Sequence, residues 1–139
     1  MSTWRISLLL AFLFAQLSGS AEACSCGKQT VEEAVAVAPF IFAGKVVELK
    51  VVATENGVDS IEALIVPQEV FKGSVGSPVT FVTDNGCCYC SYGFEIAATY
   101  LLYASERDGI FQTGACSRSA LIGAAEEDLK VLRRGQEQL

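Results

Sequence analysis

Histidine is absent from the 139-residue sequence. Without an imidazole the chain cannot form a Ser-His-Asp or Cys-His nucleophile pair, an H-E-x-x-H zinc site or an imidazole proton shuttle. Paired carboxylates could still support catalysis, but nothing in the spacing of Asp84, Glu95 and Asp108 brings them together. We therefore interpret these three as solvated charges of loops and strand ends, and expect neither enzymatic activity nor a cofactor.

Basic residues are scarce as well. The chain has 10 Lys and Arg against 16 Asp and Glu, a formal net charge of −6, and only Arg133 and Arg134 stand side by side. An acidic surface repels phosphate backbones. Nucleic acid is therefore not an expected partner.

Long apolar runs are also rare. Residues 6–17 form one, but it is too short to cross a bilayer as a permanent helix, so no membrane span is expected. Arg5 precedes the run and Ala21–Glu22–Ala23, a small-x-small cleavage site, follows it, which is typical of a secretory signal peptide. The sequence predicts a signal peptide over residues 1–23 and one secreted or periplasmic domain over residues 24–139.

Cleavage after Ala23 makes Cys24 the first residue of the mature chain. A lipid-modified cysteine is one alternative, but lipoprotein sites have a Leu-like residue three positions before the cysteine and a small residue two before it. Ala21 and Glu22 occupy these positions. A simple cut that leaves a free α-amine on Cys24 is therefore favoured.

All six cysteines lie in the exported part of the chain. An even number of cysteines in a small exported domain predicts disulfides. A zinc site made of thiolates is the alternative, and the one-residue spacers and the export signal weigh against it. Spacing alone does not choose among the possible pairings of Cys24, Cys26, Cys87, Cys88, Cys90 and Cys116.

Two helices are predicted. Thr30 with Glu33 three residues later is a capping-box pattern, and Pro39 ends the helix at about Ala38. The second helix covers residues 124–134, with acidic residues early and basic residues late, as the helix dipole favours. Its apolar stripe is expected to consist of Leu121, Ala125, Leu129 and Leu132.

Five strands are predicted from β-branched and aromatic runs between turn residues. In the first of them Val47, Leu49 and Val51 alternate with charged residues, so we expect them on one buried face, and Gly44 indicates a bulge or bend. Bent strands with short flanking helices predict a mainly β fold, a small closed five-stranded barrel of the OB type. The predicted strands are 40–52, 60–72, 79–83, 99–105 and 110–113.

Three cysteine-containing motifs stand out in the mature chain. It begins with Cys24–Ser25–Cys26, the segment CSYGF at 90–94 precedes the fourth strand, and TGACSR occupies 113–118. Together they resemble the N-terminal netrin-like domain of the tissue inhibitors of metalloproteinases (TIMPs) and its smaller secreted relatives. The resemblance covers nearly all of the mature chain, and its specificity rests on the processed Cys-x-Cys terminus.

The resemblance implies two disulfides, Cys24–Cys90 and Cys26–Cys116, which would staple the N-terminal segment to the barrel. Cys87 and Cys88 are extra to the family pattern. They can pair with each other, displace Cys90 from its pairing or link to another chain. Cys87 and Cys90 have C-x-x-C spacing, so a thiol redox site is a further alternative, although no adjacent base is evident.

The α-amine of Cys24 has chemistry of its own. A free α-amine titrates near 7.7–8.0, so a useful fraction is neutral around pH 7 and can ligate Zn²⁺. The carbonyl oxygen of the same residue can close a five-membered chelate. A catalytic zinc keeps one position for water or substrate, and a residue fitted there removes the nucleophile of hydrolysis.

The resemblance implies that Cys24 chelates the zinc of a target metalloprotease while Ser25 points to its first primed-side pocket. It also implies that Cys26 lies in the contact and that a second contact strip lies beside the terminus. Gly27–Lys28, after Cys26, departs from the proline-containing continuation that the family usually has. We expect a monomeric inhibitor of zinc metalloendopeptidases, with a non-inhibitory netrin-like module that binds an extracellular or envelope protein as the alternative. The second strip consists of Asn85, Gly86, Cys87, Cys88 and Tyr89.

Overall fold

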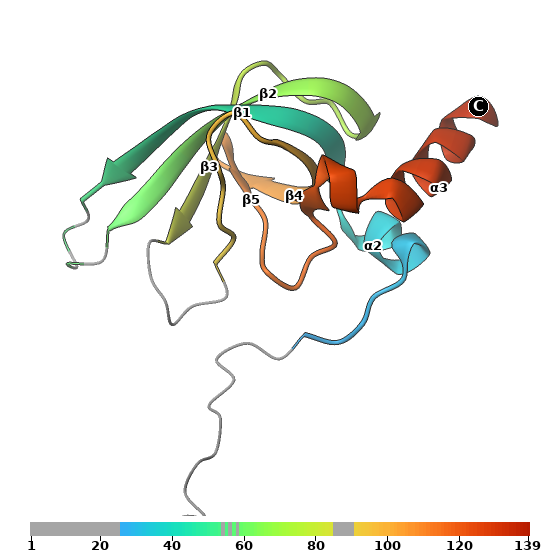
Figure 1. Ribbon diagram of the computed structural model, residues 1–139, viewed down its shortest axis with the longest axis horizontal. Coiled ribbons are helices and arrows are strands. Elements are labelled where there is room, and N and C mark those ends of the chain that lie inside the picture. Colours follow the sequence, from blue (N-terminus) through green and yellow to red (C-terminus); the bar gives the residue numbers. More distant parts are fainter. Residues whose placement is uncertain (1–25, 54, 56, 58, 85–90) are drawn as a thin grey trace, which may run out of the picture.

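The strands of the chain close into a barrel. The computed structural model describes residues 26–53, 55, 57, 59–84 and 91–139. Its sheet has the strand order β1-β2-β3-β5-β4-β6, and an additional β1–β4 pairing closes five of these strands on themselves (Figure 1). The fold is therefore mainly β, an OB-like five-stranded barrel with two short flanking helices, as the sequence predicts.

The pairing around the barrel is antiparallel except at one seam. There β3 and β5 run parallel, with Thr80 opposite Ile110 and Phe81 opposite Phe111. The predicted bounds of the first two strands are confirmed, whereas the short sixth strand was not predicted, because two residues give no periodic signal. The strands are β1 Phe40–Val52, β2 Ser60–Lys72, β3 Val79–Asp84, β4 Thr99–Arg107, β5 Ile110–Gln112 and β6 Ala120–Leu121.

The first half of β1 is buried on both faces. Phe42 points into the barrel, where it packs against Phe81 and Phe111 with ring centroids 6.2 and 5.9 Å apart. Ile41 points outward and packs with Leu101 of β4 beneath the helices. A strand covered on both faces has a continuous apolar run in its sequence rather than an alternation of apolar and polar residues.

The second half of β1 differs from the prediction. Val47 is 46% exposed and Val51 66% exposed, while Leu49 is partly buried against the core. A register shift between Val46 and Glu48 places Val47 in a bulge, and the strand goes on to pair with β2 as far as Val52. Figure 1 shows these ends of β1 and β2 projecting from the barrel. The expected buried face was therefore wrong for Val47 and Val51.

Gly44 lies at an irregularity of β1, as predicted. The register against β2 shifts between Ala43 and Gly44. A Cβ at position 44 would lie 2.6 Å from Cγ2 of Ile65 and 3.3 Å from the carbonyl oxygen of Val66. Glycine is therefore required here for a close approach of the strands.

Helix α2 spans Val31–Val37, and its predicted capping box is present. Thr30 Oγ1 accepts a 3.2 Å hydrogen bond from the backbone N–H of Glu33, and Glu33 Oε2 accepts one of 2.9 Å from the N–H of Thr30. Lys72 Nζ donates a 2.6 Å hydrogen bond to the carbonyl of Val35. The last turn of α2 is thereby tied to the end of β2.

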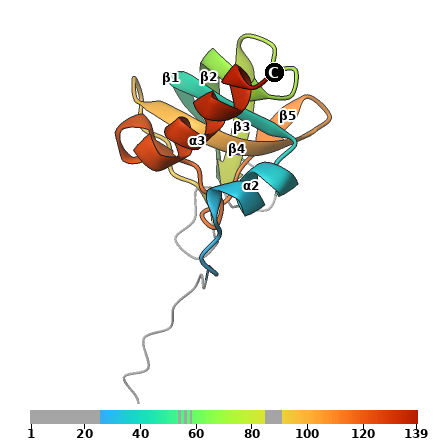
Figure 2. The same cartoon turned by 90° about the vertical axis from the view of Figure 1, so that its right-hand side faces the viewer.

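Helix α3 spans Glu126–Glu137 and follows a 3-10 turn, η1, at Ile122–Ala124. Leu121 belongs to β6 and is 44% exposed, so it does not join the apolar stripe, whereas Ala125, Leu129 and Leu132 are buried as predicted. Both helices lie on one side of the barrel (Figure 2). In the part of the chain that the structure describes, neither helix is long and apolar enough to cross a membrane.

Candidate functional site

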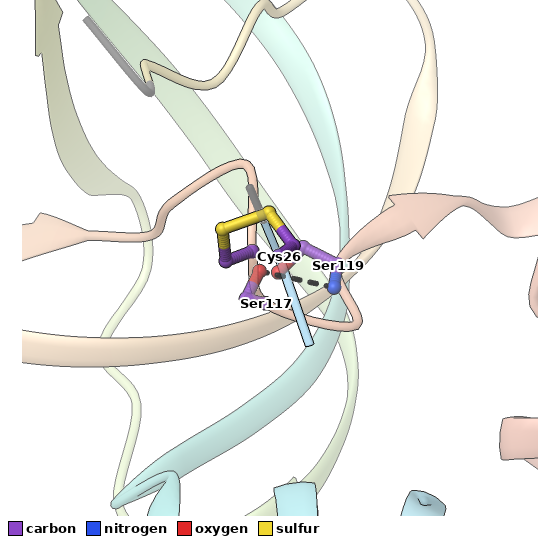
Figure 3. Close-up of a disulfide and its surroundings, with 4 residues drawn as sticks. Cys26, Ser117 and Ser119 are labelled. Atoms are coloured by element: carbon purple, nitrogen blue, oxygen red, sulfur yellow. Dashed lines mark hydrogen bonds between the residues drawn. A yellow bond between two sulfur atoms is a disulfide. The ribbon is translucent and has the colours of Figure 1, made fainter. Parts of the chain in front are cut away.

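A disulfide fixes the N-terminal segment to the loop that follows β5. Cys26 and Cys116 are bonded, with S–S 1.96 Å and Cα–Cα 5.2 Å, across a sequence separation of 90 residues (Figure 3). This is the pairing that the resemblance implies for these two residues. In the chain-entropy model a loop of this length corresponds to a stabilisation of about 4.5 kcal/mol.

Hydroxyl groups brace the loop that carries Cys116. Thr113 Oγ1 donates to the carbonyl of Tyr103 at 2.8 Å and lies 2.9 and 2.8 Å from the hydroxyls of Ser117 and Ser119. Ser119 Oγ in turn accepts from the N–H of Tyr103 at 2.8 Å. Figure 3 shows Ser117 and Ser119 beside the disulfide. The staple is therefore attached to a loop that is itself bonded to β4.

Arg118, next to the disulfide loop, contacts two other segments at once. Its Nε and Nη2 atoms donate to Oδ2 and Oδ1 of Asp128 at 2.8 and 2.6 Å, the two-point fork of an arginine–carboxylate pair. Its Nη1 atom donates to the carbonyl oxygen of Gln29 at 2.8 Å. Glu127 adds an exposed contact at 3.2 Å. Arg118 thus joins the first turn of α3 to the segment that follows Cys26.

Asp128 is buried, with 4% of its surface exposed. Burial acts to raise the pKa of its carboxyl, but hydrogen bonds from Arg118 and Tyr103 outweigh it, so the pKa lies below its usual value. Burial and the hydrogen bond to Asp128 raise the pKa of Tyr103. The hydrogen bond to Asp128 raises the pKa of Arg118. The group is therefore a neutral tyrosine on an intact ion pair.

The sequence contained a signal for this pair that the prediction missed. Asp128 lies three residues after Ala125 and four before Leu132, so it falls on the apolar stripe of α3. A carboxylate on a buried helix face needs a cationic or hydrogen-bonding partner. The helix dipole alone accounts for an acidic residue early in the helix, and Arg118 lies in the TGACSR segment that resembles the TIMPs, so neither pattern pointed to their pairing.

The loop before β4 rests on an aromatic cluster. Phe94 packs against Phe81 and Tyr100, with ring centroids 5.4 and 5.3 Å apart, and Tyr92 packs on Phe94 at 5.1 Å. The hydroxyl of Tyr100 accepts a 2.9 Å hydrogen bond from the N–H of Glu95. Tyr100 and Tyr103 are both buried. The residues that follow the predicted contact strip are thus anchored to the barrel.

Most of the predicted contact residues lie outside the described residues. These are Cys24, Ser25, Asn85, Gly86, Cys87, Cys88, Tyr89 and Cys90, so the zinc-chelating terminus, the Cys24–Cys90 disulfide and the second strip stay predictions. Cys26 is the predicted contact residue that the structure describes, and it is exposed. Glu95 and Asp108 are exposed as expected for solvated charges, and the side chain of Asp84 is outside the described set.

A groove of about 720 Å³ runs along the stapled segment. It is lined by residues of 26–32, by 115–120 and by the start of α3. Among the residues that the structure describes, every buried side-chain nitrogen or oxygen has a hydrogen-bond partner, and no three potential metal ligands gather. The described part of the site is arranged to hold a backbone segment in place.

No family model matches this chain, and no curated protein matches its sequence. The relationship to the TIMPs therefore remains a prediction that rests on the motifs and on the Cys-x-Cys terminus.

Proposed function

We propose that this chain is a secreted, monomeric inhibitor of zinc metalloendopeptidases that binds the catalytic zinc through the α-amine and carbonyl oxygen of Cys24. The observation that carries the proposal is the Cys26–Cys116 disulfide, which holds the segment next to the mature terminus on a closed barrel. A disulfide also favours an extracellular or periplasmic location.

The staple limits how far Cys24 can move. Two residues of fully extended chain span about 7 Å, so the Cα atom of Cys24 stays within that distance of the Cα atom of Cys26. A short reach of this kind reduces the conformational freedom that the terminus loses when it enters an active-site cleft. A second staple to Cys90 would restrict it further.

The proposed chemistry needs an uncapped terminus. The neutral α-amine supplies a lone pair to Zn²⁺, and the adjacent carbonyl oxygen completes the chelate. Together they displace the water that a catalytic zinc activates for hydrolysis. The side chain of Ser25 is small enough to enter the first primed-side pocket without imposing a strong preference.

The proposal is tested by blocking the amine. Mature protein that begins at Cys24 is compared with a variant carrying one additional N-terminal alanine, using cleavage of a fluorogenic peptide by a zinc endopeptidase. The extended variant is expected to lose inhibition while its thermal unfolding midpoint is unchanged. A variant with an alanine added after Leu139 is the control and is expected to inhibit normally.

Equal inhibition by the chain extended before Cys24 contradicts the zinc-chelation mechanism. Failure of the mature chain to inhibit any zinc endopeptidase, together with retained binding to an extracellular protein, supports the alternative of a non-inhibitory module. N-terminal mass mapping of the exported protein, done first, shows whether Cys24 is the first residue and carries no lipid.

A further inference from the structure

We infer that Arg118 is a positioning residue that fixes the backbone following Cys26 against α3, and so sets the direction in which the mature terminus leaves the barrel. The use of this direction for inhibition rests on the proposed function. The hydrogen bond from Arg118 to the Gln29 carbonyl, called the tie below, joins described residues and can be tested separately.

The segment between the disulfide and α2 is held at three successive points. Cys26 is bonded to Cys116, the carbonyl of Gln29 accepts from Arg118, and Thr30 forms the N-cap of α2. The disulfide alone leaves the backbone free to pivot about the Cys26 side chain. The hydrogen bond to Gln29, three residues further on, removes that freedom.

The guanidinium of Arg118 can act in this way because its orientation is fixed by Asp128. Two of its nitrogens are engaged by the carboxylate of Asp128, and Asp128 Oδ2 also accepts a 2.7 Å hydrogen bond from the hydroxyl of Tyr103. The remaining Nη1 atom is thereby aimed at the Gln29 carbonyl. The chain of contacts runs from β4 through α3 and Arg118 to the N-terminal segment.

Lysine cannot reproduce this geometry. An ammonium group is a point charge on a flexible stem, whereas guanidinium donors diverge in a fixed plane. A lysine at position 118 can pair with Asp128, which keeps a cation beside the buried carboxylate. It cannot at the same time give two hydrogen bonds to Asp128 and a third to Gln29. Arg118→Lys therefore removes the hydrogen bond to Gln29 while it keeps the ion pair with Asp128.

Arg133, on the helix that carries Asp128, offers a matched control. Its Nε and Nη2 atoms lie 3.3 and 3.0 Å from the carboxylate oxygens of Glu69, which is also a two-point fork. This pair is exposed and joins α3 to β2, away from the N-terminal segment. Arg133→Lys changes the same chemistry and leaves the Gln29 contact in place.

The test uses the exposed Lys28, inside the tied segment, as a reporter. Folded mature protein is treated with trypsin, then reduced, and cleavage of the Lys28–Gln29 bond is followed by mass spectrometry. We expect Arg118→Lys to accelerate this cleavage about tenfold and Arg133→Lys to leave it unchanged. Cleavage after Lys72, the last residue of β2, reports global unfolding and is expected to be the same in wild type, Arg118→Lys and Arg133→Lys.

Asp128→Asn is a second, independent variant, which tests the inference even if Arg118→Lys does not fold. It keeps the size of the side chain and removes the charge that orients Arg118, so faster cleavage at Lys28 is again expected. Unchanged Lys28 cleavage in a folded Arg118→Lys or Asp128→Asn protein overturns the inference. In Arg118→Lys, rises of equal size at Lys28 and Lys72 overturn it as well, because they show a general loss of stability.

Inhibition is measured on the same proteins. If the mature wild-type chain inhibits a zinc endopeptidase, Arg118→Lys is expected to raise the inhibition constant about tenfold through faster dissociation, with little effect of Arg133→Lys. An unchanged inhibition constant despite faster Lys28 cleavage overturns the link between the tie and inhibition. If the wild-type chain does not inhibit, the proposed function fails, and the Lys28 cleavage rates still decide whether Arg118 positions the segment.

Discussion

The hydroxyl of Tyr103 lies 2.7 Å from Oδ2 of Asp128 and donates a hydrogen bond to it in the interior of the molecule. The bond joins β4 to α3, and both residues are buried. Because Asp128 also receives two hydrogen bonds from Arg118, its carboxylate is the common acceptor for donors from two other segments of the chain, β4 and the loop that carries Arg118. Its environment explains how a charged residue can occupy the apolar side of a helix.

Removal of the Tyr103 hydroxyl is expected to destabilise the fold. Tyr103→Phe leaves Asp128 with one donor fewer, and a hydrogen bond to a charged group contributes about 1.5–2 kcal/mol. Urea unfolding of the mature protein measures the loss. In the Asp128→Asn background the same substitution is expected to cost clearly less. Additive effects of the two substitutions would show that the two side chains are not coupled.

Stability is expected to fall in acid partly because of Asp128. Its folded-state pKa lies below the unfolded value of about 3.9. Its contribution is therefore fully present above the unfolded pKa and is lost as the pH falls through the folded pKa. Urea unfolding between pH 7 and pH 2 should show wild type and Asp128→Asn converging as the solution becomes more acidic.

The control for this pH series is Glu127→Gln, which removes the exposed carboxylate that also contacts Arg118. The stability difference between Glu127→Gln and Asp128→Asn is expected to shrink in acid, as it does for wild type. A stability difference between wild type and Asp128→Asn that stays constant over the whole pH range would argue against a lowered pKa for Asp128.

Loss of the disulfide is expected to reduce the free energy of unfolding by up to about 4.5 kcal/mol, since the disulfide closes a loop of 90 residues. Replacing Cys26 and Cys116 together by serine avoids leaving a single free thiol. Thermal and urea unfolding measure the loss. An unchanged free energy of unfolding would contradict stabilisation by loop closure in the unfolded chain.

Gly44→Ala is expected to destabilise the barrel by about 2 kcal/mol, because the new methyl group would overlap Ile65 and crowd the backbone of Val66. Gly76→Ala is the matched control, since a Cβ there meets no atom within 4 Å. Urea unfolding compares the two variants. Equal effects would contradict crowding between β1 and β2 as the cause of the cost at position 44.

Local signals in the sequence were enough to predict most of the elements. Thr30 and Glu33 mark the start of α2 because the capping box is contained within four residues. The bounds of β1 and β2 follow from β-branched runs that end at turn residues. The barrel was predictable because the number and lengths of these strands leave few ways to bury their apolar faces.

Features that depend on tertiary pairing were not predictable in this way. The bulge that exposes Val47 arises from the register between β1 and β2, which the alternation of residues does not encode. The bond between Arg118 and Gln29 joins residues 89 positions apart. Only the acidic residue on the apolar stripe of α3 indicated that a partner must exist, and it did not say which one.

The position of the staple in the chain has a consequence for survival among proteases. Cys26 precedes β1 and Cys116 follows β5, so the bond brackets every strand of the barrel. A single peptide-bond cut in any loop between them yields two fragments that remain covalently joined. A nicked molecule can therefore stay assembled and keep its terminus in place, which suits a protein whose proposed partners are themselves proteolytic.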